Sequence, residues 1–381
     1  MRVKKIIVEC CRVLLGLVFV FSGFVKAVDP LGTAYKIHDY FGVWGLSSLD
    51  FLTLPLSVGQ SVVEFSLGVL LLLGVFRKYT SLLVLLVMCF MTPLTLYLAI
   101  GNAVSDCGCF GDALVLTNWQ TFFKNVVLLG AAGVVWRAAR CCGLDPQSPI
   151  KRGVAAVVVT VALITGLAVY CIEYLPIIDF RPYKIGNNIK ELSTVPEGAP
   201  GDEYATLLIY AKDGHTQTFT MENYPKEGTG WEFVTADIRL LKKGYEPPIH
   251  NFTITTAEGE DITEQVLDYE GYTFLVVAHR LADADVRCAA RLNDIADYAS
   301  ERNVKFLGLT ASLPKEIAEW NRLTQSFYPF CTMDAVTLKT IVRSNPGLVL
   351  LHNAVIIGKW SHNDLPREEE INKLIKNEYY R

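Results

Sequence analysis

The chain has 381 residues, of which 19% are charged and 51% hydrophobic, and its mean hydropathy is +0.30. This composition excludes a wholly water-soluble protein of this length and predicts membrane spans, so the lipid bilayer is the first expected partner. The net charge of −4 provides no basic field, and nucleic acid is therefore not an expected partner.

Five apolar segments are long enough to cross a hydrocarbon core as helices, which requires roughly 20 residues each. They lie at about residues 6–25, 51–76, 79–100, 122–135 with its flanks, and 154–174. Basic residues precede the first segment and separate the second from the third and the fourth from the fifth. By the positive-inside bias these ends are cytoplasmic. We therefore expect a multi-pass protein of the inner (cytoplasmic) membrane, with a cytoplasmic N-terminus and with everything after Tyr174 on the outer, periplasmic face.

The first segment has a second interpretation, a cleaved signal peptide, because it begins with basic residues and continues as an apolar run. No small-x-small cleavage pattern follows it, however, and Lys26 lies where one is expected. Loss of this segment would leave four spans and the same loops on the outer face.

A cysteine pair, Cys107 and Cys109, lies in the expected outer loop between the third and fourth spans. Two thiols separated by one residue can close only a small, strained ring, and a strained disulfide is labile and exchanging. Gly108 between them supplies the backbone freedom that closure needs. The neighbouring Asp106 and Asp112 should raise the pKa values of both thiols. Alternatively, each cysteine bridges to another outer cysteine, or both stay free.

Glu64 lies near the middle of the second span, where an ionised carboxylate costs several kcal/mol unless it is paired or protonated. We therefore expect it to face the interior of the bundle. One interpretation is a proton acceptor beside a quinone or a dithiol, and the other is a neutral acid bonded to a neighbouring helix. Arg12 in the first span is the expected counter-ion by its depth.

Several short motifs of the first half resemble known membrane families. RVLLGL at residues 12–17, SGFVK at 22–26 and DP at 29–30 resemble the opening signature of DoxX-type membrane proteins. EFSLG at 64–68 and CGCFG at 107–111 resemble the MauE branch, the methylamine utilisation proteins implicated in disulfide maturation of a quinoprotein dehydrogenase.

The resemblance covers about residues 1–140 and implies a four-helix redox bundle that passes electrons between thiols and a quinone. From their positions in the spans, Glu64 and Arg12 are the residues expected beside such a quinone. The vitamin K epoxide reductase family works in this way with a C-x-x-C pair, whereas this chain has only Cys107-x-Cys109.

Beyond residue 180 the pattern becomes that of a water-soluble α/β unit. Strand-like apolar runs lie at residues 205–210, 272–278, 304–309, 348–351 and 354–357, and helical patterns lie at 286–301 and 315–324. The order β-α-β-α-β-β predicts a small central sheet that is covered on both faces.

This unit resembles the thioredoxin-like family with its TlpA and peroxiredoxin-type members. Residues 248–254 with Gly259 resemble the opening strand of that family, and residues 345–351 and 354–360 resemble its cis-proline strand and the hairpin partner. The resemblance implies a cis bond before Pro346, which would face the substrate.

The family carries a C-x-x-C at the start of its first helix, whereas this chain has the single Cys288 there. The helix dipole and Arg287 could lower the pKa of Cys288, which would then act as a nucleophile that Cys331 resolves. Alternatively, the two cysteines form a structural disulfide, or both are buried and inert.

The expected organisation has four parts. They are a DoxX/MauE-like four-helix membrane domain at 1–140, a fifth transmembrane helix with its connections at 141–180, a β-rich extracytoplasmic segment of unknown role at 181–244, and a thioredoxin-like domain at 245–381. No Cys/His spacing typical of zinc occurs in the sequence, and no metal is predicted.

These patterns support two functional hypotheses. The first is a membrane thiol–disulfide relay that exchanges electrons between an extracytoplasmic thiol-containing protein, the chain's own cysteines and a membrane quinone; the strain argument favours an oxidising role. The second is a non-catalytic, membrane-anchored assembly or binding module with a degenerate thioredoxin-like domain. The two differ in whether Cys107 and Cys109 cycle between oxidised and reduced states.

Overall fold

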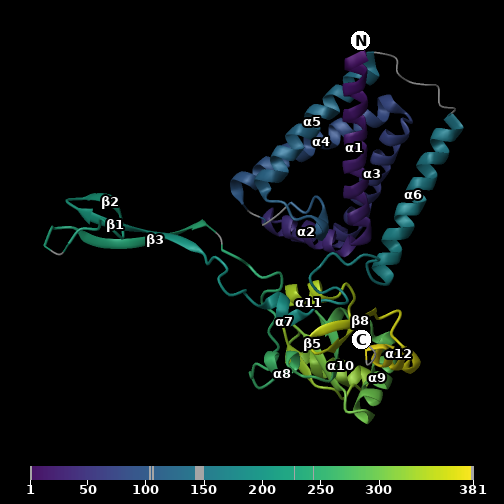
Figure 1. Ribbon diagram of the computed structural model, residues 1–381, viewed down its shortest axis with the longest axis vertical. Coiled ribbons are helices and arrows are strands. Elements are labelled where there is room, and N and C mark those ends of the chain that lie inside the picture. The colour runs from purple at the N-terminus through teal and green to yellow at the C-terminus, as the bar shows by residue number, and fades with distance from the viewer. Residues whose placement is uncertain are drawn as a thin grey trace.

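The computed structural model describes residues 2–102, 104, 107–141, 150–226, 228–242 and 244–378. A bundle of long helices forms one end of the molecule and an α/β domain the other, while a separate three-stranded sheet projects sideways from both (Figure 1). The N-terminal end of the chain lies at the end of the bundle that is remote from the α/β domain (Figure 1).

Five helices of the described residues are long and apolar enough to span a membrane, as the hydropathy pattern predicts. They are α1 (Arg2–Val28), α3 (Thr53–Leu73), α4 (Arg77–Gly101), α5 (Asn118–Cys141) and α6 (Ile150–Glu173). The fifth, α6, runs beside the others and leads into the α/β domain (Figure 1).

Helices α1 and α3 approach each other closely because glycines lie where they meet. A Cβ atom added to Gly68 would lie 2.5 Å from the backbone nitrogen of Val20, and one added to Gly23 would overlap the backbone of Phe65. Small residues at helix interfaces allow this approach in membrane proteins. The close packing brings the polar residues of the two helices within bonding distance.

Helix α2 (Pro30–Val43) lies across the end of the bundle that faces the α/β domain (Figure 1). The hydropathy pattern predicts only a loop here. Asp29 caps this helix by accepting a hydrogen bond from the Gly32 amide at 2.9 Å, and Pro30 occupies its first turn. The Asp-Pro pair is a helix-start signal in the sequence, so this element was open to prediction.

The α/β domain contains a five-stranded mixed sheet in the order β6-β5-β4-β7-β8. Its strands are β4 (Tyr272–Ala278), β5 (Lys305–Thr310), β6 (Phe330–Thr332), β7 (Gly347–His352) and β8 (Val355–Ser361). Strands β4, β5 and β6 run parallel, and β7 is antiparallel to both β4 and β8.

Both faces of this sheet are covered by helices and buried apolar side chains. One face carries α9 (Ala289–Glu301), α10 (Pro314–Thr324) and α12 (Glu368–Glu378). The other carries α7 (Ile189–Ser193), α8 (Thr263–Leu267) and α11 (Ala335–Ile341). The layered arrangement matches the prediction and is thioredoxin-like in strand order.

Two details of the thioredoxin-like prediction have different outcomes. The Asn345–Pro346 bond is cis, as the resemblance implies. The predicted opening strand at residues 248–254 is wrong, since pairing in this region is confined to isolated bridges of Thr255 with Asp261 and Thr332. The short strand β6 was missed because three residues are too few to show a period.

The projecting sheet consists of β1 (Glu203–Lys212), β2 (His215–Thr220) and β3 (Glu232–Lys242) in the antiparallel order β2-β1-β3. The residues before it belong to the α/β domain, because Tyr183 and Ile189 are buried in its core. The β-rich segment predicted at 181–244 therefore begins with a stretch that packs against the thioredoxin-like sheet.

Candidate functional site

Cys107 and Cys109 lie in the loop between α4 and α5, at the end of the bundle near α2. Their Sγ atoms are 3.1 Å apart and are not joined in a disulfide. Gly108 between them has a φ of +65°, a left-handed conformation that favours glycine. Among the described residues every cysteine is free, so the alternative in which each bridges to another outer cysteine is not found.

Two helices hold the backbone of this loop. The Tyr40 hydroxyl of α2 donates to the Cys107 carbonyl at 3.1 Å. The Ser22 hydroxyl of α1 lies 2.6 Å from the Cys109 carbonyl. The positions of both thiols are therefore set by side chains of the bundle.

Glu64 of α3 faces the interior of the bundle, as predicted, and is 8% exposed. Lys26 of α1 donates to its two carboxylate oxygens at 2.6 and 2.8 Å. Ser22 lies 2.7 Å from one of these oxygens, and Gln60 donates to the other at 2.9 Å. A serine hydroxyl has one proton, so Ser22 can donate either to Glu64 or to the Cys109 carbonyl at any moment.

The predicted counter-ion Arg12 is wrong, since Lys26 has that role. Arg12 donates to Glu9 at 2.8 Å and to the carbonyls of Leu71 and Leu72. Helices α1 and α3 are antiparallel, so the residues of α1 that lie opposite Glu64 are near its C-terminal end and not near Arg12. Depth alone could not reveal this.

The two thiols have unequal proton affinities. The pKa of Cys109 is lowered because the Cys107 thiol donates a hydrogen bond to it and because Lys124 and Lys26 favour a negative charge. The pKa of Cys107 is raised by the same hydrogen bond and by burial. The prediction that acidic neighbours raise both pKa values is therefore wrong for Cys109; Asp106 lies outside the described residues.

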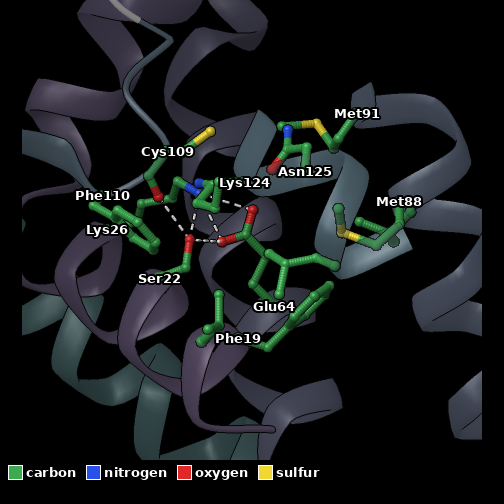
Figure 2. Close-up of a pocket in the computed structure, with 13 residues that line it drawn as sticks. Phe19, Ser22, Lys26, Glu64, Met88, Met91, Cys109, Phe110, Lys124 and Asn125 are labelled. Atoms are coloured by element: carbon green, nitrogen blue, oxygen red, sulfur yellow. Dashed lines mark hydrogen bonds and ion pairs between the residues drawn. The ribbon is translucent and has the colours of Figure 1, made fainter. Parts of the chain in front are cut away.

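Figure 2 shows Ser22, Lys26 and Glu64 directed toward one another, with Cys109 and Lys124 beside them. They line a small cavity of about 40 Å³ together with side chains of α4 and α5. The cavity brings together one thiol of the pair, an ion pair and a hydroxyl, which are groups that can take part in proton transfer and thiol chemistry.

A larger groove of about 600 Å³ starts at the same ion pair and extends between α2, α3 and α4. Its polar end is formed by Lys26, Glu64, Gln60, Tyr40 and Cys107. Apolar and aromatic side chains form most of the remainder: Ile37, Phe41, Trp44, Leu56, Val63, Leu86, Val87, Phe90, Met91 and Leu94. Several of these, including Phe90, are exposed and would face lipid in a bilayer.

Cys288 of the α/β domain lies in a different setting. Its thiol is buried directly before α9 and donates to the Asp285 carbonyl at 3.1 Å. Burial and the nearby Asp285 carboxylate raise its pKa to about 12. The expectation of a lowered pKa is wrong, because burial and Asp285 outweigh the effect of Arg287, whose guanidinium pairs with Asp285.

Cys288 and Cys331 are buried against opposite faces of the central sheet. Neither the resolving pair nor the structural disulfide predicted for them is found, and the alternative of two buried thiols agrees with the structure. The cis-proline loop does lie near Cys288, because the Asn345 carbonyl accepts a hydrogen bond from the Asp285 amide at 3.0 Å. That Pro346 faces a substrate stays a prediction.

The fold and this site define a multi-pass membrane protein with a dithiol loop at one end of its helix bundle and a thioredoxin-like α/β domain next to it. Residues 4–138 match the family model of methylamine utilisation protein MauE, so this part of the chain, which spans α1 to α5, is similar to that family. Residues 204–243, which contain β1 to β3, match a domain of unknown function, DUF8463. The DoxX likeness stays a prediction.

One similar solved structure is described as the solution structure of a "putative protein disulfide isomerase from Bacteroides thetaiotaomicron". The match has 18% identity and a TM-score of 0.26, and it covers 34% of this chain and 83% of the other. The thioredoxin-like fold is therefore defined by its own strand order and not by this match. No curated protein matches the chain.

Proposed function

We propose that the chain is a thiol–disulfide oxidoreductase of the inner membrane, whose working dithiol is Cys107 and Cys109. The observation that carries the proposal is the 3.1 Å separation of the two thiols beside the buried pair of Lys26 and Glu64. The positive-inside bias supports a periplasmic α/β domain, because the basic connections lie at the opposite end of the bundle.

The unequal thiols support an oxidising direction. A thiolate of an extracytoplasmic protein attacks the Cys107–Cys109 disulfide at Cys107, forms a mixed disulfide and releases Cys109 as a thiolate. A thiol of low pKa leaves fastest, and Lys124 and Lys26 stabilise this thiolate. The second thiolate of the partner protein then breaks the mixed disulfide, so the partner is oxidised and the pair returns as a dithiol.

A membrane quinone is the proposed acceptor for the two electrons of the dithiol. Its reduction to a quinol also takes two protons, which the two thiols supply as the disulfide forms. The groove suits such a substrate because its apolar sides fit a ring and a lipid-like tail, while Lys26, Glu64 and Gln60 form the polar end. Glu64 can accept the Cys109 proton and pass it on.

A second candidate, the assembly or binding module, is favoured by one observation for the α/β domain alone. Cys288 is buried, has a raised pKa and has no cysteine partner among the described residues. This domain therefore supports binding better than redox exchange.

The test is thiol trapping in intact cells with a mass-tagged alkylating reagent. We expect the wild-type chain to carry two fewer tags after oxidation, because Cys107 and Cys109 are then joined, and to carry them again after reduction. The Cys107→Ser, Cys109→Ser double variant should lose this response, whereas the matched Cys288→Ser variant should keep it. If the loop thiols stay reduced under every condition, the assembly module is the function that remains.

A further inference from the structure

Arg343 of the α/β domain is buried, with 5% of its surface exposed, yet its charge is neutralised by the membrane domain. It follows α11 and comes three residues before the cis-proline. Its guanidinium lies 2.9 Å from a carboxylate oxygen of Asp29 and 3.3 Å from one of Asp112. A cation so fully removed from water requires such partners.

The contact with Asp29 is built tightly at the start of α2. The Arg343 Nε lies 3.0 Å from each Asp29 oxygen, and the Tyr35 ring lies 5.3 Å from the guanidinium. A Cβ added to Gly32 would lie 2.5 Å from the Asp29 carboxylate and 2.9 Å from the Arg343 guanidinium, so a larger residue there would displace this pair. This contact docks the α/β domain on the bundle.

The contact with Asp112 reaches the dithiol loop itself. Asp112 comes three residues after Cys109, in the turn Gly111–Ala113. The loop is thus held at three points, by Tyr40 at Cys107, by Ser22 at Cys109 and by Arg343 at Asp112. The third point belongs to another domain, which gives that domain a direct contact with the cysteine loop.

We propose that Arg343 is a positioning residue for the cysteine pair, through which the docked α/β domain sets the balance between dithiol and disulfide. The inference rests on the proposed function of Cys107 and Cys109. The Arg343–Asp112 contact is present while both thiols are free, and closing the disulfide must bring the sulfurs nearer than 3.1 Å. We infer that closure, which moves Cys109, three residues before Asp112, weakens this contact, so that the contact favours the reduced loop and its loss favours the disulfide.

The test uses the full chain in lipid nanodiscs, equilibrated with glutathione buffers of stepped redox ratio and then trapped by alkylation. We expect Arg343→Gln and Asp112→Asn each to shift the equilibrium toward the disulfide by about fivefold or more, the lower range of a coupling between sites. The double variant should shift it no further than Arg343→Gln alone, because that change already removes the contact with Asp112. Arg343→Lys keeps the positive charge and should therefore shift the equilibrium less than Arg343→Gln. The exposed control Arg322→Gln should not shift it.

Asp112→Asn leaves the contact between Arg343 and Asp29 intact, so a shift in this variant cannot be attributed to undocking or unfolding of the α/β domain. An unchanged equilibrium in this variant and in Arg343→Gln would overturn the inference, as would shifts that multiply in the double variant. A wild-type pair that never forms a disulfide would instead overturn the proposed function. In that case the alkylation rates of Cys107 and Cys109 test the positioning: a changed rate in Arg343→Gln supports it, and an unchanged rate refutes it.

Discussion

Cys109 in the membrane domain is half-buried and Cys288 in the α/β domain is buried, and the charges around the two thiols differ. Burial raises the pKa of either thiol. For Cys109, the hydrogen bond from the Cys107 thiol and the charges of two lysines outweigh burial and lower the pKa. For Cys288, the Asp285 carboxylate adds to the effect of burial and raises the pKa further. The comparison teaches that the thioredoxin-like shape does not by itself make a reactive thiol, because the charges around the sulfur decide.

The largest expected effect comes from breaking the ion pair under the dithiol. Lys26→Met leaves Glu64 buried without its cation, which should destabilise the bundle by about 3–5 kcal/mol. Detergent unfolding of the purified chain measures this, and adding Glu64→Gln should recover part of the loss. Equal stability of Lys26→Met and the matched Lys124→Met would contradict the assignment, since the Lys124 ammonium lies over the Phe110 ring and Lys26 is the cation that pairs with Glu64.

The next effect concerns the close approach of α1 and α3. Gly23→Ala adds a methyl group against the backbone of Phe65 and should cost about 1–3 kcal/mol of bundle stability. Because Ser22 and Lys26 lie on the same part of α1, the variant should also slow the thiol response. Gly130→Ala is the matched control, since its new methyl group meets no atom within 4 Å.

Thiol reactivity sharpens the comparison directly. At pH 7, Cys109 should be alkylated at least about tenfold faster than Cys288, because only the thiolate reacts and one pKa is lowered while the other is about 12. Its rate should fall as the pH is lowered through the pKa of Cys109. Lys124→Ala should slow Cys109 and leave Cys288 unchanged, as peptide mass spectrometry can measure. Similar rates for the two cysteines would remove the contrast between the domains.

The smallest effect tests the stability of the α/β domain. Burial and the nearby Lys339 lower the pKa of His279 to about 4, against about 6.5 for an unfolded histidine. Between these values the unfolded chain binds the proton and the folded chain does not, so stability falls as the pH drops from about 6.5 to 4. In thermal unfolding, His279→Asn should weaken the dependence of stability on pH in this range. An unchanged pH dependence would show that other groups cause it.

The sequence predicts features that depend on local pattern. The five apolar helices and strand β4 at residues 272–278 could be predicted from hydropathy and from the length and composition of the apolar runs. The inward orientation of Glu64 could be predicted because an ionised carboxylate is costly in lipid. The partner of Glu64 could not be predicted in this way, because it depends on which turn of α1 lies opposite. The contact of Arg343 with Asp112 joins residues 231 positions apart and follows only from docking of the domains.

The pairing of Lys26 with Glu64 has a consequence for how the protein is made. Helix α1 leaves the ribosome before α3, so its lysine has no carboxylate to meet until the second apolar segment arrives. Because an unpaired charge is costly in a bilayer, the two helices are expected to enter the lipid as a pair, or Lys26 to stay at the outer interface until α3 is in place. The ion pair of Lys26 and Glu64 is thus expected to affect insertion of the bundle as well as its packing.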